Sequence, residues 1–302
     1  MNFDIKFLDI QKYQDSDLTF IASFIAELNK QPEHHIAYFG TTLEEIEHYL
    51  LEEQSIPPEE SYLKGFYKGE FAGVIGLEYD LDLKRAWIEG PLIQSPYWNE
   101  IAEELYSAVL NHIPETINDY ELACDTRNVY LGELAAKHGY FNNGDAALLV
   151  FRRGSLTGLP EIHEPQLEEG YASQLQSLHD QLFPGTYYSG KQLLGKIDQH
   201  HKIFAVTKAE SLLGYIFVYV SPSIGDAYID FIGVKEDVRR QGYGKRLLVS
   251  ALHWIFSFPE VNQVGLTVRV ENEAAVKMYE DSGFNYERTL RGYRKKISSS
   301  GF

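Results

Sequence analysis

The stretch that most constrains the fold runs from Tyr228 to Leu248, where a short apolar segment is followed by a glycine-containing turn and an amphipathic segment. Residues 228–234 are β-branched and aromatic and lie between turn-forming residues, which predicts a buried strand. Residues 241–256 repeat apolar side chains at spacings of three, four, seven and eight, which predicts a helix with one face in the core. The junction therefore places a helix N-terminus directly after a strand.

Glycine and positive charge are concentrated in this junction. Gly242 and Gly244 allow a positive φ or a close approach between backbone and ligand, and N–H groups at a helix start can bind an anion. In a chain of formal net charge −17, four cations lie in the same turn: Arg239, Arg240, Lys245 and Arg246. The pattern predicts an anion-binding turn. A plain strand-to-helix turn accounts poorly for two glycines and four cations together.

Length and composition limit the class of protein. The 302 residues suit two domains of about 150 each. An excess of 44 Asp and Glu over 27 Lys and Arg argues against nucleic acid or an anionic membrane as a partner. The N-terminus does not resemble a signal peptide, and no apolar run is long enough to cross a membrane. We therefore expect a cytoplasmic protein.

Metal binding is not expected from the sequence. A single cysteine, Cys124, forms no internal disulfide and provides no thiolate cluster. The pairs His34-His35 and His200-His201 lack a third ligand at zinc-like spacing.

The two halves of the chain predict the same order of elements, which indicates a duplication. Expected strands are 2–10, 61–67, 70–78, 85–89, 121–124, 146–152, 203–208, 212–219, 228–234, 263–268, 285–290 and 293–297. Expected helices are 15–29, 97–112, 128–137, 168–182, 190–200, 241–256 and 272–282. One more helix, the second in chain order, is expected to begin after a cap at Thr41 or Thr42.

A constant spacing between matching residues of the two halves supports the duplication. Asn128 to Gly139 and Asn272 to Gly283 have the same length and are 144 residues apart, and an aromatic residue follows each glycine. The same offset aligns the helix at 241–257 with residues 97–113, and it places Trp98 opposite Gly242. The first half is thus predicted to keep this helix and to lose the anion-binding turn. Expected domains are 1–155 and 163–302, with a linker within 154–169.

Two spaced motifs resemble those of the GNAT superfamily of acetyl-CoA-dependent N-acetyltransferases. Residues 239–244, Arg-Arg-Gln-Gly-Tyr-Gly, match the pattern of Arg or Gln, two residues, Gly, one residue, and Gly or Ala. The second motif, Asn-x-x-Ala-x-x-x-Tyr-x-x-x-Gly-Phe, matches Asn272, Ala275, Tyr279, Gly283 and Phe284. The N-terminal half resembles the family only in its element order and in residues 128–141. The resemblance implies an α/β fold of two tandem GNAT-like domains, each a mixed, mostly antiparallel twisted sheet flanked by helices, with a degenerate N-terminal copy.

The resemblance also implies site residues, with acetyl-CoA as cosubstrate. The backbone of Phe231, Ile232 and Val234 would contact the pantetheine arm. The pyrophosphate would be held by the backbone N–H groups of Gln241, Gly242, Tyr243, Gly244 and Lys245. The nearby cations Arg239 and Arg240 would also bind the cofactor. Asn272 would be a polar coenzyme A contact, and Tyr279 would be the general acid that protonates the leaving thiolate. A packed tyrosine is the alternative for Tyr279.

The acceptor side is less specified. Asp230 is either the general base or a solvated carboxylate, and the sequence leaves both open. Phe183, Tyr187 and Tyr188 suit an acceptor wall, although loop packing explains them nearly as well. A dinucleotide-binding loop is disfavoured because the third glycine is absent.

We expect acetyl transfer to a primary amine of an unidentified small molecule or peptide. The alternative is a catalytically silent acyl-CoA-binding sensor or interaction protein. The sequence does not predict the oligomeric state.

Overall fold

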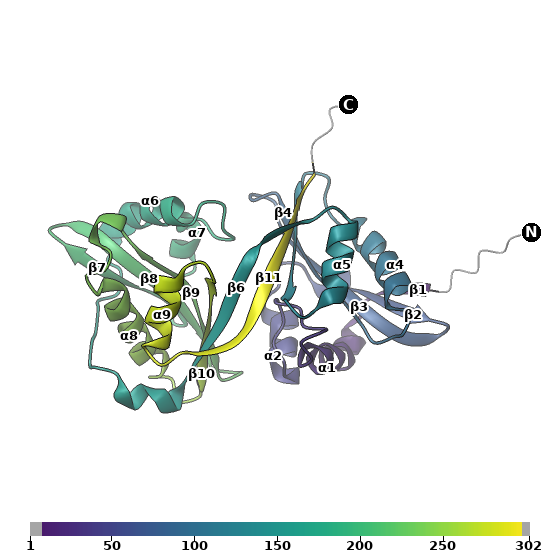
Figure 1. The fold of residues 1–302 in the computed structure, drawn as a ribbon, viewed down its shortest axis with the longest axis horizontal. Helices are drawn as coiled ribbons and strands as arrows, with labels where there is room; N and C mark the ends of the chain where they lie inside the picture. The colour runs from purple at the N-terminus through teal and green to yellow at the C-terminus, as the bar shows by residue number, and fades with distance from the viewer. Residues whose placement is uncertain (1–7, 298–302) are drawn as a thin grey trace, which may run out of the picture. The chain divides into compact units, whose positions relative to one another are not determined.

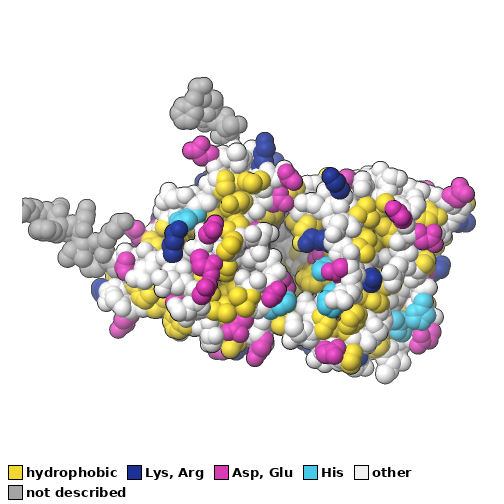
Figure 2. Space-filling view, turned by 180° about the vertical axis from the view of Figure 1, so that it is seen from behind, with side chains coloured by type: hydrophobic (Ala, Val, Ile, Leu, Met, Phe, Trp, Pro, Cys, Tyr) yellow, Lys and Arg dark blue, Asp and Glu magenta, His cyan; other side chains and the backbone are white. Residues whose placement is uncertain are grey.

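The computed structural model describes residues 8–297 and divides into two compact units (Figure 1). The C-terminal unit holds Ala146–Arg288. The N-terminal unit holds the residues before Ala146 together with those after Arg288. Acidic side chains are spread over the face seen in Figure 2, in keeping with the net charge of −17. Among residues 8–297, every helix is too short or too polar to cross a lipid bilayer.

The N-terminal unit is a sheet in the order β1-β2-β3-β4-β5-β11 around one hydrophobic core. Its strands pair antiparallel except β4 and β5, which pair in parallel. The strands are β1 (Leu8–Lys12), β2 (Leu63–Tyr67), β3 (Glu70–Asp80), β4 (Arg85–Ile93), β5 (Asp119–Asp125) and β11 (Asn285–Lys296). The helices are α1 (Leu18–Asn29), α2 (Leu43–His48), α3 (Pro58–Ser61), α4 (Trp98–Leu110) and α5 (Val129–Lys137).

The C-terminal unit is a sheet in the order β6-β10-β9-β8-β7, in which β9 and β10 pair in parallel. The strands are β6 (Phe141–Arg152), β7 (His201–Lys208), β8 (Ser211–Ser221), β9 (Asp226–Val234) and β10 (Gln263–Arg269). The helices are α6 (Ala172–Leu182), α7 (Gly190–Gly195), α8 (Tyr243–Ile255) and α9 (Glu273–Glu280). One core lies under α6 and α7, and the other lies under α8 and α9, on opposite faces of the sheet (Figure 1).

Each unit takes its closing strand from the other half of the sequence. Residues 146–152 of β6 pair with β10 in the C-terminal unit, and residues 290–296 of β11 pair with β5 in the N-terminal unit. The expected domains, 1–155 and 163–302, keep each closing strand in its own half, so the structure differs from them here. The apolar pattern of a strand does not specify which sheet it joins, because Leu149 and Phe151 would be buried in either.

The duplication is visible in the geometry of the later elements. β5 and β10, and also β6 and β11, begin and end at positions 144 apart. Asn128 caps α5 by accepting from Leu131 N at 3.0 Å, and Asn272 caps α9 by accepting from Ala275 N at 3.3 Å. The offset of 144 is therefore confirmed from β5 onward.

Before α4 and α8 the offset is different. β3 and β8, and likewise β4 and β9, begin and end at positions 141 apart. Eight residues, 235–242, join β9 to α8, whereas four residues, 94–97, join β4 to α4. The single offset was therefore wrong in this region, and the residue before α4 that corresponds to Gly242 is Tyr97 rather than Trp98. The first half has lost part of the turn itself as well as its glycines.

Two smaller expectations need correction, and a third lies partly outside the described residues. The helix expected at 190–200 ends at Gly195, because the Asp198 carboxylate accepts from the N–H groups of His200 and His201 and stabilises a turn. The two strands expected after residue 285 form one strand, because Gly292 keeps its pairing with Ala123. Of the strand expected at 2–10, residues 2–7 lie outside the described residues.

The expected linker is ordered against the C-terminal unit. The Ser250 hydroxyl on α8 donates to Ile162 O at 3.1 Å and accepts from Glu164 N at 2.7 Å. The Arg153 guanidinium donates to the carbonyl groups of Phe256 and Val261 after α8. The segment that follows β6 is thus part of this unit.

Candidate functional site

A β-bulge interrupts strand β9 at Asp230. The register with β8 passes from Phe217↔Phe231 to Val218↔Ile229, so Asp230 is the extra residue on β9. A bulge increases the local twist and redirects side chains. Asp230 and Phe231 consequently both contact Tyr187, although they are neighbours on one strand.

Beyond this bulge β9 separates from its parallel neighbour. Within the described residues, β9 pairs with β10 at Gly265↔Tyr228, near the start of β9, whereas its pairing with β8 continues to Val234. One edge of the later half of β9 is therefore open to an extended ligand that pairs with its backbone. The Val234 carbonyl is already engaged, because it accepts from Arg239 Nε at 3.1 Å.

The turn after β9 opens helix α8 with a glycine. Gly242 is the N-cap residue and has φ +85°, and the preceding Arg240 has φ +63°. A side chain at Gly242 would extend into open space. The N–H groups of the first helical turn have no intrahelical acceptor, and a glycine N-cap provides no side-chain acceptor for them. These residues fit an anion held by the backbone, as the sequence predicts.

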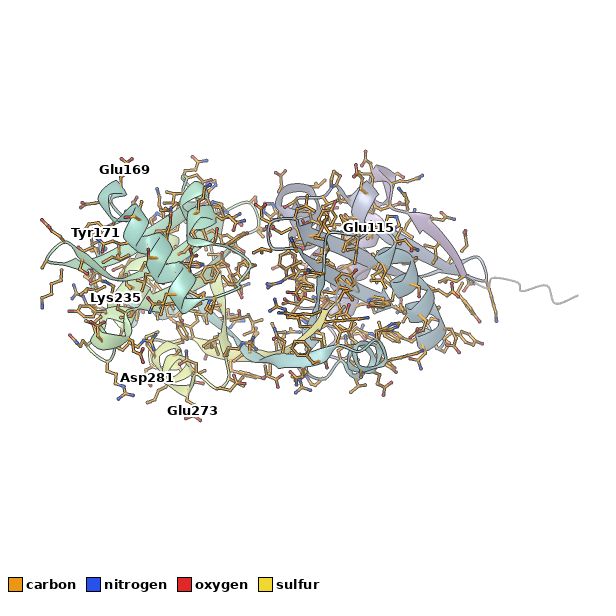
Figure 3. All side chains as sticks on the ribbon, turned by 90° about the horizontal axis from the view of Figure 1, so that it is seen from above. Glu115, Glu169, Tyr171, Lys235, Glu273 and Asp281 are labelled. Carbon is orange, nitrogen blue, oxygen red and sulfur yellow. The ribbon has the colours of Figure 1, made fainter. Side chains whose placement is uncertain are left out.

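The cations around the turn have different environments. Arg246 pairs with Glu164 at 2.6 Å, and Arg239 contacts the Val234 carbonyl. Lys235, labelled in Figure 3, donates to Ser211 Oγ at 3.0 Å. Arg240 and Lys245 are exposed beside the glycine turn. Long-range attraction of an anion is thus provided mainly by Arg240 and Lys245.

Gly244 has a packing role in addition to its place in the turn. A Cβ at this position would lie 3.2 Å from the Met278 sulfur, which is closer than ordinary contact. The glycine therefore lets α8 approach α9.

Helix α9 buries Tyr279. Tyr279 is 4% exposed, whereas most of the helix is accessible, and Figure 3 shows Glu273 and Asp281 on the outside at its two ends. The ring meets Phe284 edge-on, with centroids 5.6 Å apart. Burial raises the pKa of the phenol, so it stays protonated around neutral pH. Asn272, expected to contact coenzyme A, caps this helix through its side chain.

The expected acceptor residues meet at the bulge. Tyr187 donates its hydroxyl to Asp230 Oδ1 at 3.0 Å, and its ring lies 5.1 Å from that of Phe231. Phe183 also contacts Phe231, with centroids 5.1 Å apart, and Tyr188 meets Tyr187 at 4.9 Å. The structure thus joins the bulge to the segment 183–189, which the sequence had only placed between two helices.

One buried residue in this region was missed. His179 is fully buried on α6 and lies next to Tyr188 and Phe231. The available signal was a histidine within the apolar stripe that includes Leu175, Leu178 and Leu182. A core histidine produces the same pattern, so the signal is weak.

The equivalent region of the N-terminal unit is filled by its own side chains. At the offset of 141, Glu89 takes the place of Asp230, and Pro91, which has no N–H, takes the place of Ile232. Glu89 is 1% exposed and accepts from the hydroxyls of Tyr49 and Tyr62 and from Gln54 Nε2. Burial raises the pKa of Glu89 to about 7.

The helix N-terminus of this unit is covered as well. Trp98, the first residue of α4, stacks on Tyr130 with centroids 5.2 Å apart. Ala135 stands where α9 has Tyr279, at the offset of 144. Gly242, Asp230, Ile232 and Tyr279 thus have different residues at their positions here, whereas Asn272 keeps its counterpart in Asn128. Across residues 8–297, His, Cys, Asp and Glu side chains nowhere gather in a group that could hold a metal ion.

Comparisons with known proteins agree with this geometry. Residues 161–284 match the model of the acetyltransferase (GNAT) family. A search of curated proteins finds no match to the chain.

Several solved structures share the fold over nearly the whole chain. A GCN5-related N-acetyltransferase from Sphaerobacter thermophilus is 15% identical with a TM-score of 0.71, and the match covers 97% of this chain and 96% of that one. A tandem GNAT protein from the clavulanic acid biosynthesis pathway is 13% identical with a TM-score of 0.65, covering 97% and 100% of the two chains. A putative acetyltransferase from Pyrococcus horikoshii is 12% identical with a TM-score of 0.62, covering 98% and 92%. At these identities the likeness is one of fold.

Proposed function

Because residues 161–284 match the model of the acetyltransferase (GNAT) family, we propose that the C-terminal unit transfers an acetyl group from acetyl-CoA directly to a primary amine. When bound, acetyl-CoA supplies an activated thioester. The residues of this chain bind it, orient it and move the protons.

The backbone provides the binding contacts in this proposal. N–H groups of the first turn of α8, opened by Gly242, hold the pyrophosphate, and the exposed Arg240 and Lys245 add positive charge. The open edge of β9 at Phe231 and Ile232 pairs with the pantetheine arm. This places the thioester beside the bulge at Asp230.

Two side chains, Asp230 and Tyr279, transfer protons in the proposed reaction. Asp230 takes a proton from the acceptor ammonium, and the neutral nitrogen then attacks the thioester carbonyl carbon. As the new C–N bond forms and the C–S bond breaks, Tyr279 gives its phenolic proton to the departing sulfur. The second proton released by the new amide nitrogen restores the phenol through solvent. No acyl-enzyme forms, and the acceptor lies against Phe183, Tyr187 and Tyr188.

The observation that carries the proposal is the continuity of β9 and α8. A strand that is bulged and open on one edge leads into a helix N-terminus capped by a glycine in open space. The N-terminal unit has a strand β4 that is likewise bulged against β3 and pairs with β5 at Arg85–Trp87, but its turn before α4 is shorter and has no glycine cap. The contrast is difficult to explain if the turn were only a connection.

The test measures thiol release and acetyl-amine formation with acetyl-CoA over a panel of primary amines. We expect an amine-dependent release of coenzyme A with matching acetylated product. Gly242→Trp should abolish it, because the indole would fill the space in front of the α8 N-terminus. Gly69→Trp is the matched control: Gly69 also has a positive φ, +84°, and open space, but lies in the N-terminal unit.

Two outcomes would contradict the proposal. Equal activity in Gly242→Trp and Gly69→Trp would contradict the assignment of the pyrophosphate to the N-terminus of α8. Coenzyme A binding without product from any amine would instead favour a silent acyl-CoA sensor.

A further inference from the structure

His179 is a buried polar side chain for which the proposed reaction has no role. It lies on α6 with no exposed surface. Its ring packs edge-on against Phe231, with centroids 4.8 Å apart, and is tilted against Phe183, with centroids 5.4 Å apart. Burying a polar side chain in such surroundings lowers the stability of the fold unless its hydrogen bonds are satisfied.

Both ring nitrogens of His179 have partners, and together these fix its tautomer. Nε2 lies 2.8 Å from the carbonyl oxygen of Tyr188, which can only accept, so Nε2 carries the proton. Nδ1 lies 2.6 Å from the hydroxyl of Tyr215 on β8 and therefore accepts from it. The neutral ring satisfies both bonds at once.

The bond to Tyr188 acts on the segment that carries Tyr187. Tyr187 is 37% exposed, and its hydroxyl bond to Asp230 is its polar contact with β9. The main chain beside it is held by His179, and the segment then enters α7, where Gly190 N donates to Asp180 Oδ1 at 2.9 Å. The buried imidazole is therefore placed to determine where Tyr187 lies.

We propose that neutral His179 is a positioning residue: by holding the Tyr188 carbonyl, it keeps the segment 183–189 in place and the Tyr187 hydroxyl against Asp230. The kinetic consequence rests on the proposed function, whereas the structural consequence does not. His179 touches neither the acceptor nor the thioester. Its effect on the reaction passes through Tyr187.

The groups that face the ring determine its response to pH. They are the Tyr215 hydroxyl from β8, the Tyr188 carbonyl, Phe231 from β9, Phe183 and, on α6 itself, the Asp180 carboxylate. Burial lowers the pKa of His179, while the Tyr188 carbonyl and Asp180 act in the opposite direction. Protonation would put a second N–H against the Tyr215 hydroxyl and remove the acceptor that this hydroxyl uses. Protonation keeps the Nε2–H donor to the Tyr188 carbonyl, so it disturbs the contact with Tyr215 and not the bond that holds the segment 183–189.

The experiment compares His179→Leu, His179→Gln and wild type in the full chain by hydrogen exchange of the amides of residues 183–190. Leu removes both bonds and should speed exchange roughly five- to tenfold, the effect of losing about one hydrogen bond. Gln has one donor and one acceptor and should restore slow exchange. Ser177→Ala is the matched control, because the Ser177 hydroxyl donates to Ser173 O at 3.0 Å within α6 itself. It should leave exchange unchanged.

Two further measurements complete the test. Coenzyme A binding should be the same in all four proteins, and the KM of the best amine should rise in His179→Leu with little change in kcat. If no amine is acetylated, the proposed function fails but the exchange measurement still decides the positioning role. Unchanged exchange in His179→Leu would overturn the proposal.

A variant that fails to fold does not end the test. Imidazole nitrogen spectra of the wild type should show His179 as the Nε2–H tautomer, with a pKa below the ordinary histidine value. An Nδ1–H tautomer, or titration at the ordinary value, would overturn the proposal.

Discussion

Tyr279 carries the most specific chemical role in the proposed reaction. Its phenol is buried against Phe284, and burial raises its pKa, so the acid form dominates at and above neutral pH. A proton donor of this kind contributes to the breaking of the C–S bond and not to coenzyme A binding.

The first prediction follows because Tyr279 acts in breaking the C–S bond and not in binding coenzyme A. Tyr279→Phe should lower kcat on the order of 10²-fold and leave the coenzyme A dissociation constant nearly unchanged, because the ring packing is kept. Tyr286→Phe, at an exposed tyrosine at the start of β11, is the control. Steady-state kinetics and calorimetric titration measure the two quantities. Full activity in Tyr279→Phe would exclude it as the acid.

Glu89 makes a second prediction, for pH-dependent stability. Burial raises its pKa from the ordinary 4.5 to about 7, so the folded state holds the proton more tightly than the unfolded chain. The contribution of Glu89 to stability is therefore complete below about pH 4.5 and lost as the pH rises toward about 7. Glu89→Gln, which stays neutral, should reduce the fall in urea midpoint between about pH 5 and about pH 8. An identical fall in both proteins would show that Glu89 is ionised in the folded state.

Individual residues differ in how far the sequence predicts them. Gly242 was predictable because positive φ at a helix start is a local property. The contact between Tyr187 and Asp230 was not, because the bulge that turns Asp230 toward Tyr187 depends on the register with β8. His179 was missed because a histidine in an apolar stripe gives the same pattern whether or not it holds a loop.

At the scale of elements, the exchanged strands are the main structural finding. Strand β11 is fixed in the N-terminal unit by Arg294, whose guanidinium makes a bidentate contact with Asp119. Burial alone would raise the pKa of Asp119, but Arg294 and Arg85 hold it below its ordinary value. Arg291 makes a similar paired contact with Asp145.

The third prediction concerns the ion pair between Arg294 and Asp119. Arg294→Met should lower the free energy of unfolding of the N-terminal unit by about 2 kcal/mol, because it leaves the nearly buried Asp119 with weaker compensation. Arg152→Met removes an exposed pair with Glu287 and should cost at most about 0.5 kcal/mol. Urea unfolding measures both. Equal losses would mean that the ion pair does not anchor β11.

The elements themselves were largely predictable, whereas their partners were not. Asn128 and Asn272 cap their helices through bonds to residues three positions away, so sequence alone located both. The assignment of β6 to β10 depends on residues more than a hundred positions apart. The shortened turn at 94–97 became visible only when the strands fixed an offset of 141 before it.

At the scale of the whole molecule, the two units contain the same order of elements, but α8 is capped by a glycine and its counterpart α4 is capped by Tyr97. The N-terminal unit has a turn of four residues before α4, a proline in place of Ile232 and an alanine in place of Tyr279. Glu89, at the position of Asp230, is buried and accepts hydrogen bonds from neighbouring side chains of its own unit. We therefore expect the chain to bind a single coenzyme A, in the C-terminal unit.

The most direct test is the stoichiometry of coenzyme A binding to the full chain by calorimetric titration. We predict one site per chain, which is lost in Gly242→Trp and kept in Gly69→Trp. Both substitutions place a side chain at a positive φ and cost about 1 kcal/mol of backbone strain, so a difference between them reports on the site. Two sites per chain, or one site that survives Gly242→Trp, would contradict the account.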